Sequence, residues 1–80
     1  MAKKAFHLFF TQTLIKEPLM FLAARDNNLL LNIRRAKITA EAGEATIEFE
    51  GELKDIEKAE KALKTKGVQV EPVLGDIVEG

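Results

Sequence analysis

The chain has 80 residues, of which 46% are hydrophobic and 31% are charged, a composition typical of one small soluble domain. Its 12 lysines and arginines nearly balance 13 aspartates and glutamates, so no net charge favours nucleic acid or an anionic membrane. The lack of cysteine excludes disulfides, thiolate metal sites and iron–sulfur clusters held by this chain. The apolar stretch near the start is too short for a signal peptide or direct membrane insertion, and we expect a cytoplasmic location.

Residues 4–10 alternate in polarity and are rich in phenylalanine, which predicts a strand. Residues 17–28 predict a helix with Pro18 in its first turn, where the missing N–H of proline does no harm. Asn27 or Asn28 is suited to end this helix in the left-handed conformation. The helix is apolar most of the way round. We expect Leu19, Leu22 and Ala23 to pack on a sheet, which leaves Met20, Phe21 and Ala24 to be covered either by loops and a second helix or by a partner or ligand.

Residues 29–39 predict a second strand, in which Asn32 interrupts an apolar run. Ile33 and Ala36 have opposite parity, so we expect a β-bulge near Arg34 and Arg35. If Ile33 faces the helices, Asn32 faces the other side of the sheet or its rim. There it is available to a ligand or to a second copy of the chain, or it caps an irregularity of the edge, as asparagine often does.

The second half of the chain repeats the alternation of strand and helix. Gly43 predicts a turn with positive φ, and residues 45–50 predict a strand with one polar face. Residues 52–67 predict an amphipathic helix, and Pro72 predicts that residues 68–73 form an edge strand or its end. The expected apolar stripe of this helix consists of Leu53, Ile56, Ala59 and Leu63.

The order of elements indicates an α+β protein with the ferredoxin-like βαββαβ sandwich. Its four-stranded antiparallel sheet is expected to have the order 4-1-3-2, with both helices on one face. We expect a single domain over residues 1–73 and a flexible tail over residues 74–80.

The residues contain no pattern that indicates catalysis. There is no glycine-rich phosphate loop and no set of ligands with metal-site spacing, so we expect neither an enzyme nor a protein with a cofactor or metal. Nucleic-acid binding of the RNA-recognition type needs stacking aromatics on the two central strands, where this chain has Glu48 and Glu50. A binding or regulatory module remains.

The segments "EPLMFLAARDNNLLLNIRRAKIT" and "GELKDIEKAEKALKTKGVQVEPV", with a glycine-containing turn and a strand between them, resemble the NIL domain family. That family is named for an Asn-Ile-Leu tripeptide in its second strand. The corresponding tripeptide here is Asn32-Ile33-Arg34, so its third position departs from the family pattern. The resemblance covers residues 4–73.

The resemblance implies a regulatory domain of the ATPase subunit of methionine ABC transporters, in which NIL domains pair as homodimers, bind methionine and inhibit amino-acid transport. The asparagine of the motif belongs to the methionine site and corresponds to Asn32. Other NIL domains precede ferredoxin modules in proteins of sulfur and homocysteine metabolism. The implied partners are therefore L-methionine, a second copy, and either a transporter ATPase or a ferredoxin-type protein.

Two hypotheses follow. In the first, the chain is a dimeric sensor of methionine or a related sulfur amino acid. Its polar groups would be bound at Asn32 and its thioether in an apolar slot. In the second, it is a non-catalytic interaction module in sulfur metabolism with no ligand of its own. The predicted ligand-binding residues are Asn32, Ile33, Met20, Phe21 and Leu29.

Overall fold

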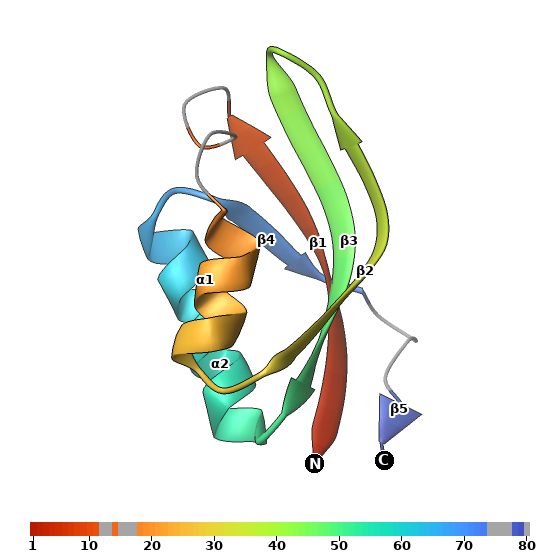
Figure 1. The fold of residues 1–80 in the computed structure, drawn as a ribbon, viewed down its shortest axis with the longest axis vertical. Helices are drawn as coiled ribbons and strands as arrows, with labels where there is room; N and C mark the ends of the chain where they lie inside the picture. The colour runs from red at the N-terminus through yellow and green to blue at the C-terminus, as the bar shows by residue number, and fades with distance from the viewer. Residues whose placement is uncertain (12–13, 15–17, 74–77, 80) are drawn as a thin grey trace.

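The computed structural model describes residues 1–11, 14, 18–73 and 78–79. The elements in chain order are β1 (Ala2–Thr11), α1 (Leu19–Asp26), β2 (Leu30–Ile38), β3 (Ala42–Gly51), α2 (Leu53–Thr65), β4 (Gln69–Pro72) and β5 (Val78–Glu79). Figure 1 shows two layers, with both helices on one face of the sheet. The predicted ferredoxin-like βαββαβ fold is confirmed.

The main sheet has the strand order β2-β3-β1-β4, which is the predicted order read from the other edge. All neighbouring strands are antiparallel, and β1 pairs with β3 from Ala2 opposite Gly51 to Thr11 opposite Ala42. The short β5 pairs with the first residues of β1. Of the predicted tail, only residues 78–79 belong to the described part of the chain. The two outer strands of the main sheet are β2, which has nine residues, and β4, which has four.

The core lies between the sheet and the helices, and the alternation of the central strands decides which side chains enter it. Phe6 of β1 and Phe49 of β3 are at most 1% exposed, and their rings lie 6.0 Å apart at an interplanar angle of 55°, an arrangement favourable for aromatic pairs. The helix α2 buries three of the four residues of its predicted stripe, Ile56, Ala59 and Leu63. The fourth, Leu53, is the first residue of the helix and is 46% exposed.

The helix α1 is shorter than predicted, since it begins at Leu19. The carbonyl oxygen of Pro18 accepts the Leu22 N–H at 3.0 Å, so the proline lies just before the first turn; residue 17 lies outside the described part of the chain. The side chain of Ala24, expected to need a separate cover, is buried in the main core. In the part of the chain that the structure describes, neither helix is long and apolar enough to cross a membrane.

Both helices end in the same way. Asn28 has φ 56° and Gly67 has φ 98°, and the residue after each, Leu29 or Val68, donates its N–H to the carbonyl oxygen five positions earlier at 2.9 or 3.0 Å. This is the hydrogen bond of a Schellman motif, which needs a left-handed residue at the turn. The predicted left-handed asparagine is therefore Asn28.

The β2–β3 hairpin differs from the prediction. Gly43 was expected in the turn with positive φ, but it is a buried residue of β3 opposite Ile38. The turn lies earlier because Thr39 closes it: its N–H donates to the carbonyl oxygen of Ala42 at 2.8 Å, and its hydroxyl accepts the Ala42 N–H at 3.2 Å. Threonine side chains stabilise turns through such local hydrogen bonds.

Candidate functional site

The bulge of β2 brings two polar residues of the edge strand to one place. The register pairs Asn32 with Glu48, Ile33 with Ile47, and Arg35 with Thr46. Arg34 is the extra residue between these pairs, which confirms the predicted bulge. Because Ile47 belongs to the core and Glu48 does not, Asn32 faces the side of the sheet that the helices leave open.

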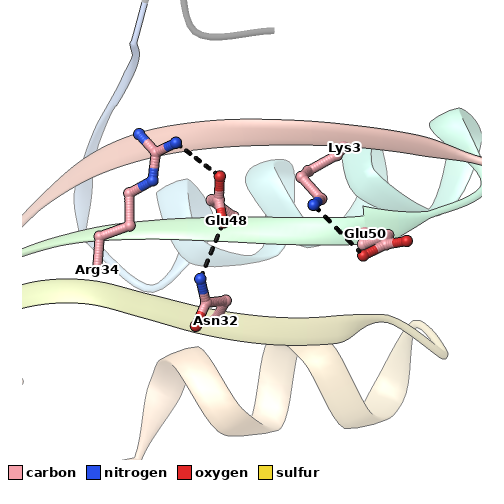
Figure 2. A network of polar contacts seen from close by, with 5 residues as sticks. All are labelled: Lys3, Asn32, Arg34, Glu48 and Glu50. Carbon is pink, nitrogen blue, oxygen red and sulfur yellow. Dashed lines mark hydrogen bonds and ion pairs between the residues drawn. The ribbon is translucent and has the colours of Figure 1, made fainter. Parts of the chain in front are cut away.

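Glu48 is the centre of a polar network on this open face (Figure 2). The amide nitrogen of Asn32 donates to Oε1 of Glu48 at 2.9 Å, and Nη2 of Arg34 lies 2.7 Å from Oε2. Next to this network, Nζ of Lys3 on β1 lies 3.9 Å from a carboxylate oxygen of Glu50 on β3. The network around Glu48 therefore joins β2 to β3, and the neighbouring Lys3–Glu50 pair joins β1 to β3.

The carboxylate of Glu48 is held in its charged form. Glu48 is only 8% exposed, and its pKa is lowered from the ordinary value of 4.5, first by the hydrogen bond from Asn32, against the opposing effect of burial, and then by the positive charges of Arg34 and Lys3. Hydrogen bonds and nearby cations stabilise a carboxylate more than its neutral acid. Glu48 is thus an anion covered by neighbouring side chains.

A hollow of about 360 Å³ adjoins this network. Its polar lining is formed by Asn32, Glu48, Glu50 and Lys3, and its apolar lining by Leu30 and Leu31. Small-molecule sites typically combine apolar walls with a few convergent polar groups. Of the two leucines, Leu30 lies opposite Glu50 on the open face, whereas Leu31 lies opposite the core residue Phe49. Side chains of both charges beside Leu30 suit a small molecule that carries an ammonium and a carboxylate group and has an apolar tail.

The structure does not bring the other predicted ligand residues to Asn32. Met20 and Phe21 of α1 line an apolar cavity of about 160 Å³ with Ile38 at the end of β2, on the helix side of the sheet. Phe21 is 57% exposed, so part of the apolar surface of α1 has no cover among the described residues. We base the candidate site on the larger hollow, because only that one adjoins the network around Asn32.

Leu29 and Ile33 have different positions from those expected of a ligand slot. Leu29 is 9% exposed and belongs to the core, where it packs close to Gly51. Ile33 is 39% exposed and has the parity of the helix side, next to Asn32 in the chain but on the opposite face. Within one chain, only Asn32 of the five predicted residues lines the polar hollow.

A second polar contact on the open face joins β1 to β3. Nδ1 of His7 on β1 lies 2.8 Å from the hydroxyl of Thr46 on β3, directly across the strand pair. The His7 ring also contacts Phe9 edge-on at 4.7 Å between centroids. Cross-strand and same-face contacts of this kind stabilise sheets. Among the described residues, no group of three or more His, Cys, Asp or Glu side chains is arranged to hold a metal ion.

Glu48, Arg34 and Leu30 were not among the residues predicted for the site. The signal for Glu48 was present, since residues 45–50 alternate so that Glu48 faces away from the core on the same side as Asn32. Their contact depends on the register between β2 and β3, which brings together residues 16 positions apart in the chain. The bulge that turns Arg34 toward Glu48 was predicted, but its consequence for this arginine was not.

Comparisons with known proteins agree with the fold. None of the curated proteins matches the chain. The crystal structure of the C-terminal domain of an ABC transporter/ATP-binding protein from Enterococcus faecalis is similar, with a TM-score of 0.79 and 22% sequence identity over 91% of this chain and 86% of that chain. The sequence model of the NIL domain matches residues 4–72, which include both helices, the four main strands except the first two residues of β1, and the side chains Asn32, Arg34 and Glu48. The chain therefore belongs to the NIL domain family.

Proposed function

We propose that this protein is a non-catalytic regulatory domain that binds methionine or a related sulfur amino acid. The observation that carries the proposal is the hollow beside Asn32, which combines Glu48, Glu50 and Lys3 with the exposed side chain of Leu30. An amino acid has one ammonium and one carboxylate group, and each needs a partner of opposite charge when it leaves water. The family resemblance supplies methionine as the specific candidate.

The apolar side of the hollow is suited to a thioether. Leu31 lies opposite the core residue Phe49 and packs partly against the core. Leu30 is 64% exposed and lies opposite Glu50, so its apolar surface is next to the polar network. Contact with methionine would remove this surface from water, at about 25 cal/mol per Å². In this proposal Leu30 contacts the thioether, in place of Met20, Phe21 and Leu29, which were predicted to form the slot.

We propose that the domain acts as a homodimer. Among the described strands, β2 pairs with β3 alone, and an edge strand can pair with a second copy through its free N–H and C=O groups. Apolar side chains exposed along β2, Leu30 at 64% and Ile38 at 60%, would be partly covered by such pairing. Because Asn32 lies on the same strand, a ligand bound there would be close to the dimer seam.

The proposed partner is the ATPase subunit of a transporter, which would give the domain a cytoplasmic location. The similar domain from Enterococcus faecalis is the C-terminal domain of an ABC transporter/ATP-binding protein, and at 22% identity the likeness shows the fold. The exposed β2 edge equally favours a second function, in which the domain docks a protein of sulfur metabolism of the ferredoxin type and has no ligand of its own.

Isothermal titration of the purified chain with L-methionine tests the proposal, with D-methionine and L-leucine as ligand controls. We expect saturable binding of L-methionine that is lost in Asn32→Ala and retained in Gln69→Ala, which removes an exposed amide–carboxylate contact away from the hollow. Light scattering measures the oligomeric state in parallel. A dimer that releases no heat with millimolar L-methionine would refute the sensor and leave the interaction module.

A further inference from the structure

The amide of Asn32 has two ends with opposite chemistry, and Glu48 contacts only one of them. An ionised carboxylate accepts hydrogen bonds and donates none, so it selects the orientation in which the amide nitrogen points toward it. This is the orientation in the structure, with Nδ2 of Asn32 2.9 Å from Oε1 of Glu48 (Figure 2). The carbonyl oxygen of Asn32 is consequently turned away from Glu48 and has no hydrogen-bond partner among the described residues.

Arg34 holds the Glu48 carboxylate that determines the orientation of the Asn32 amide. Its guanidinium holds the second oxygen of Glu48 at 2.7 Å, which leaves the first oxygen for Asn32. This distance is within the range of charge-assisted hydrogen bonds, which are shorter and stronger than hydrogen bonds between neutral groups. Arg34 stands where the NIL motif has leucine, so this way of orienting the asparagine follows from the departure of this chain from the family pattern.

We propose that Glu48 is a positioning residue that orients the Asn32 amide so that its carbonyl oxygen receives the ammonium group of the ligand. The hollow fits this polarity, because the Glu48 and Glu50 carboxylates lie beside Asn32 and attract a cation. Lys3, 3.9 Å from Glu50, is the cation of the hollow that is available to a ligand carboxylate. The identity of the ligand as an amino acid rests on the proposed function, whereas the preference for ammonium follows from the orientation of the amide.

Nuclear magnetic resonance of the Asn32 side-chain NH₂ group tests this without assuming methionine. The probes are n-butylammonium chloride and sodium butyrate, which have an apolar tail of similar length and opposite charge, together with L-methionine. We expect n-butylammonium to shift the Asn32 NH₂ resonances in a saturable way and butyrate to leave them unchanged. In Glu48→Gln the side chain can both donate and accept, so the amide loses its single orientation. We expect its response to n-butylammonium to fall by about tenfold, the effect of losing one charge-assisted hydrogen bond.

Glu44→Gln is the matched control, since it removes a carboxylate of the same strand and face that does not contact Asn32. We expect this variant to keep the response of the wild-type protein. In the unliganded wild-type protein, the Asn32 NH₂ resonances should also move as Glu48 is protonated at acid pH, and in Glu48→Gln they should not. This second measurement separates orientation of the amide from simple attraction by a negative charge.

The outcomes distinguish the two proposals. A response to n-butylammonium without one to methionine would refute the proposed sensor and support the role of Glu48. Equal responses to n-butylammonium and butyrate, or no response to either, would overturn the role of Glu48 whatever methionine does. The role of Glu48 would also be overturned if Glu48→Gln responded to n-butylammonium as the wild-type protein does. The same holds if the Asn32 NH₂ resonances of the wild-type protein did not move when Glu48 is protonated.

Discussion

Replacing Asn32 by alanine should destabilise the fold even without a ligand. The substitution removes the hydrogen bond that Asn32 donates to the covered carboxylate of Glu48 at 2.9 Å. Hydrogen bonds to charged groups contribute about 1.5–3 kcal/mol. Because the described part of the chain has no second layer over this face, water screens the contact, and we expect a loss of about 1–2 kcal/mol at pH 7. In a domain of this size, each kcal/mol lowers Tm by about 4–8 °C.

The pH dependence of this loss has a definite sign. The pKa of Glu48 is lowered in the folded protein, first by Asn32. A carboxyl group with a lowered pKa contributes stability above its unfolded pKa, near 4.5, and loses that contribution as the pH falls through the lower folded value. The difference in free energy of unfolding between wild type and Asn32→Ala should therefore be full at pH 7 and should shrink below pH 4.5 as Glu48 becomes protonated.

Urea unfolding followed by far-UV circular dichroism is the appropriate assay, because the chain has neither tryptophan nor tyrosine. Gln69→Ala is the control, since Gln69 donates to Glu71 at the same distance of 2.9 Å but on an exposed surface; we expect its effect to stay within about 0.5 kcal/mol. If the two variants are equally stable, or if the loss in Asn32→Ala is as large at about pH 3 as at pH 7, the contact does not act on a charged, covered Glu48.

Three further stability predictions follow from the backbone and the core, and all are measured by the same urea titration. Gly67→Ala should cost about 1 kcal/mol because φ is 98°, and Gly67→Asn should cost less, since asparagine tolerates this conformation at Asn28; equal losses would contradict the argument. Gly51→Ala should cost about 1–3 kcal/mol, because its Cβ would lie 2.6 Å from Cδ2 of Leu29, and wild-type stability would show that Leu29 can move aside. Ile47→Ala, at a fully buried site, should cost about 2–5 kcal/mol, whereas Ile38→Ala, at 60% exposure, should cost less than about 1 kcal/mol; similar losses would show that burial does not govern the effect.

Predictions from local pattern agreed best with the structure where the pattern extended over several residues. The alternation of residues 45–50 predicted which side chains of β3 enter the core. The periodicity of residues 52–67 predicted four stripe residues of α2, and three of them are buried. The change of parity after Ile33 predicted the bulge, because a pleated strand cannot bury residues of both parities on one face without an extra residue. These features depend on neighbours in the chain, so a single sequence is enough to infer them.

Predictions that depended on one residue were less successful. Gly43 was assigned to the turn because glycine tolerates positive φ, but the hydrogen bonds of Thr39 close the turn earlier. Leu53 was assigned to the apolar stripe, but its position at the start of α2 leaves it 46% exposed. In both cases the residue type permitted the predicted role without requiring it.

At the candidate site, too, the local pattern predicted one part and the tertiary structure decided the other. Sequence alone identified Asn32 as the exception in an apolar strand and predicted that, if Ile33 faces the helices, Asn32 lies on the opposite face of the sheet or at its rim. Only the tertiary structure decided that Asn32 and Arg34 share Glu48, and that Met20 and Phe21 form a separate cavity on the other side of the sheet. The physical reason is that the contacts of Glu48 depend on the register of β2 against β3 and on the position of the bulge. A shift by one residue would turn Asn32 toward the core, and that register is determined by packing across the whole sheet.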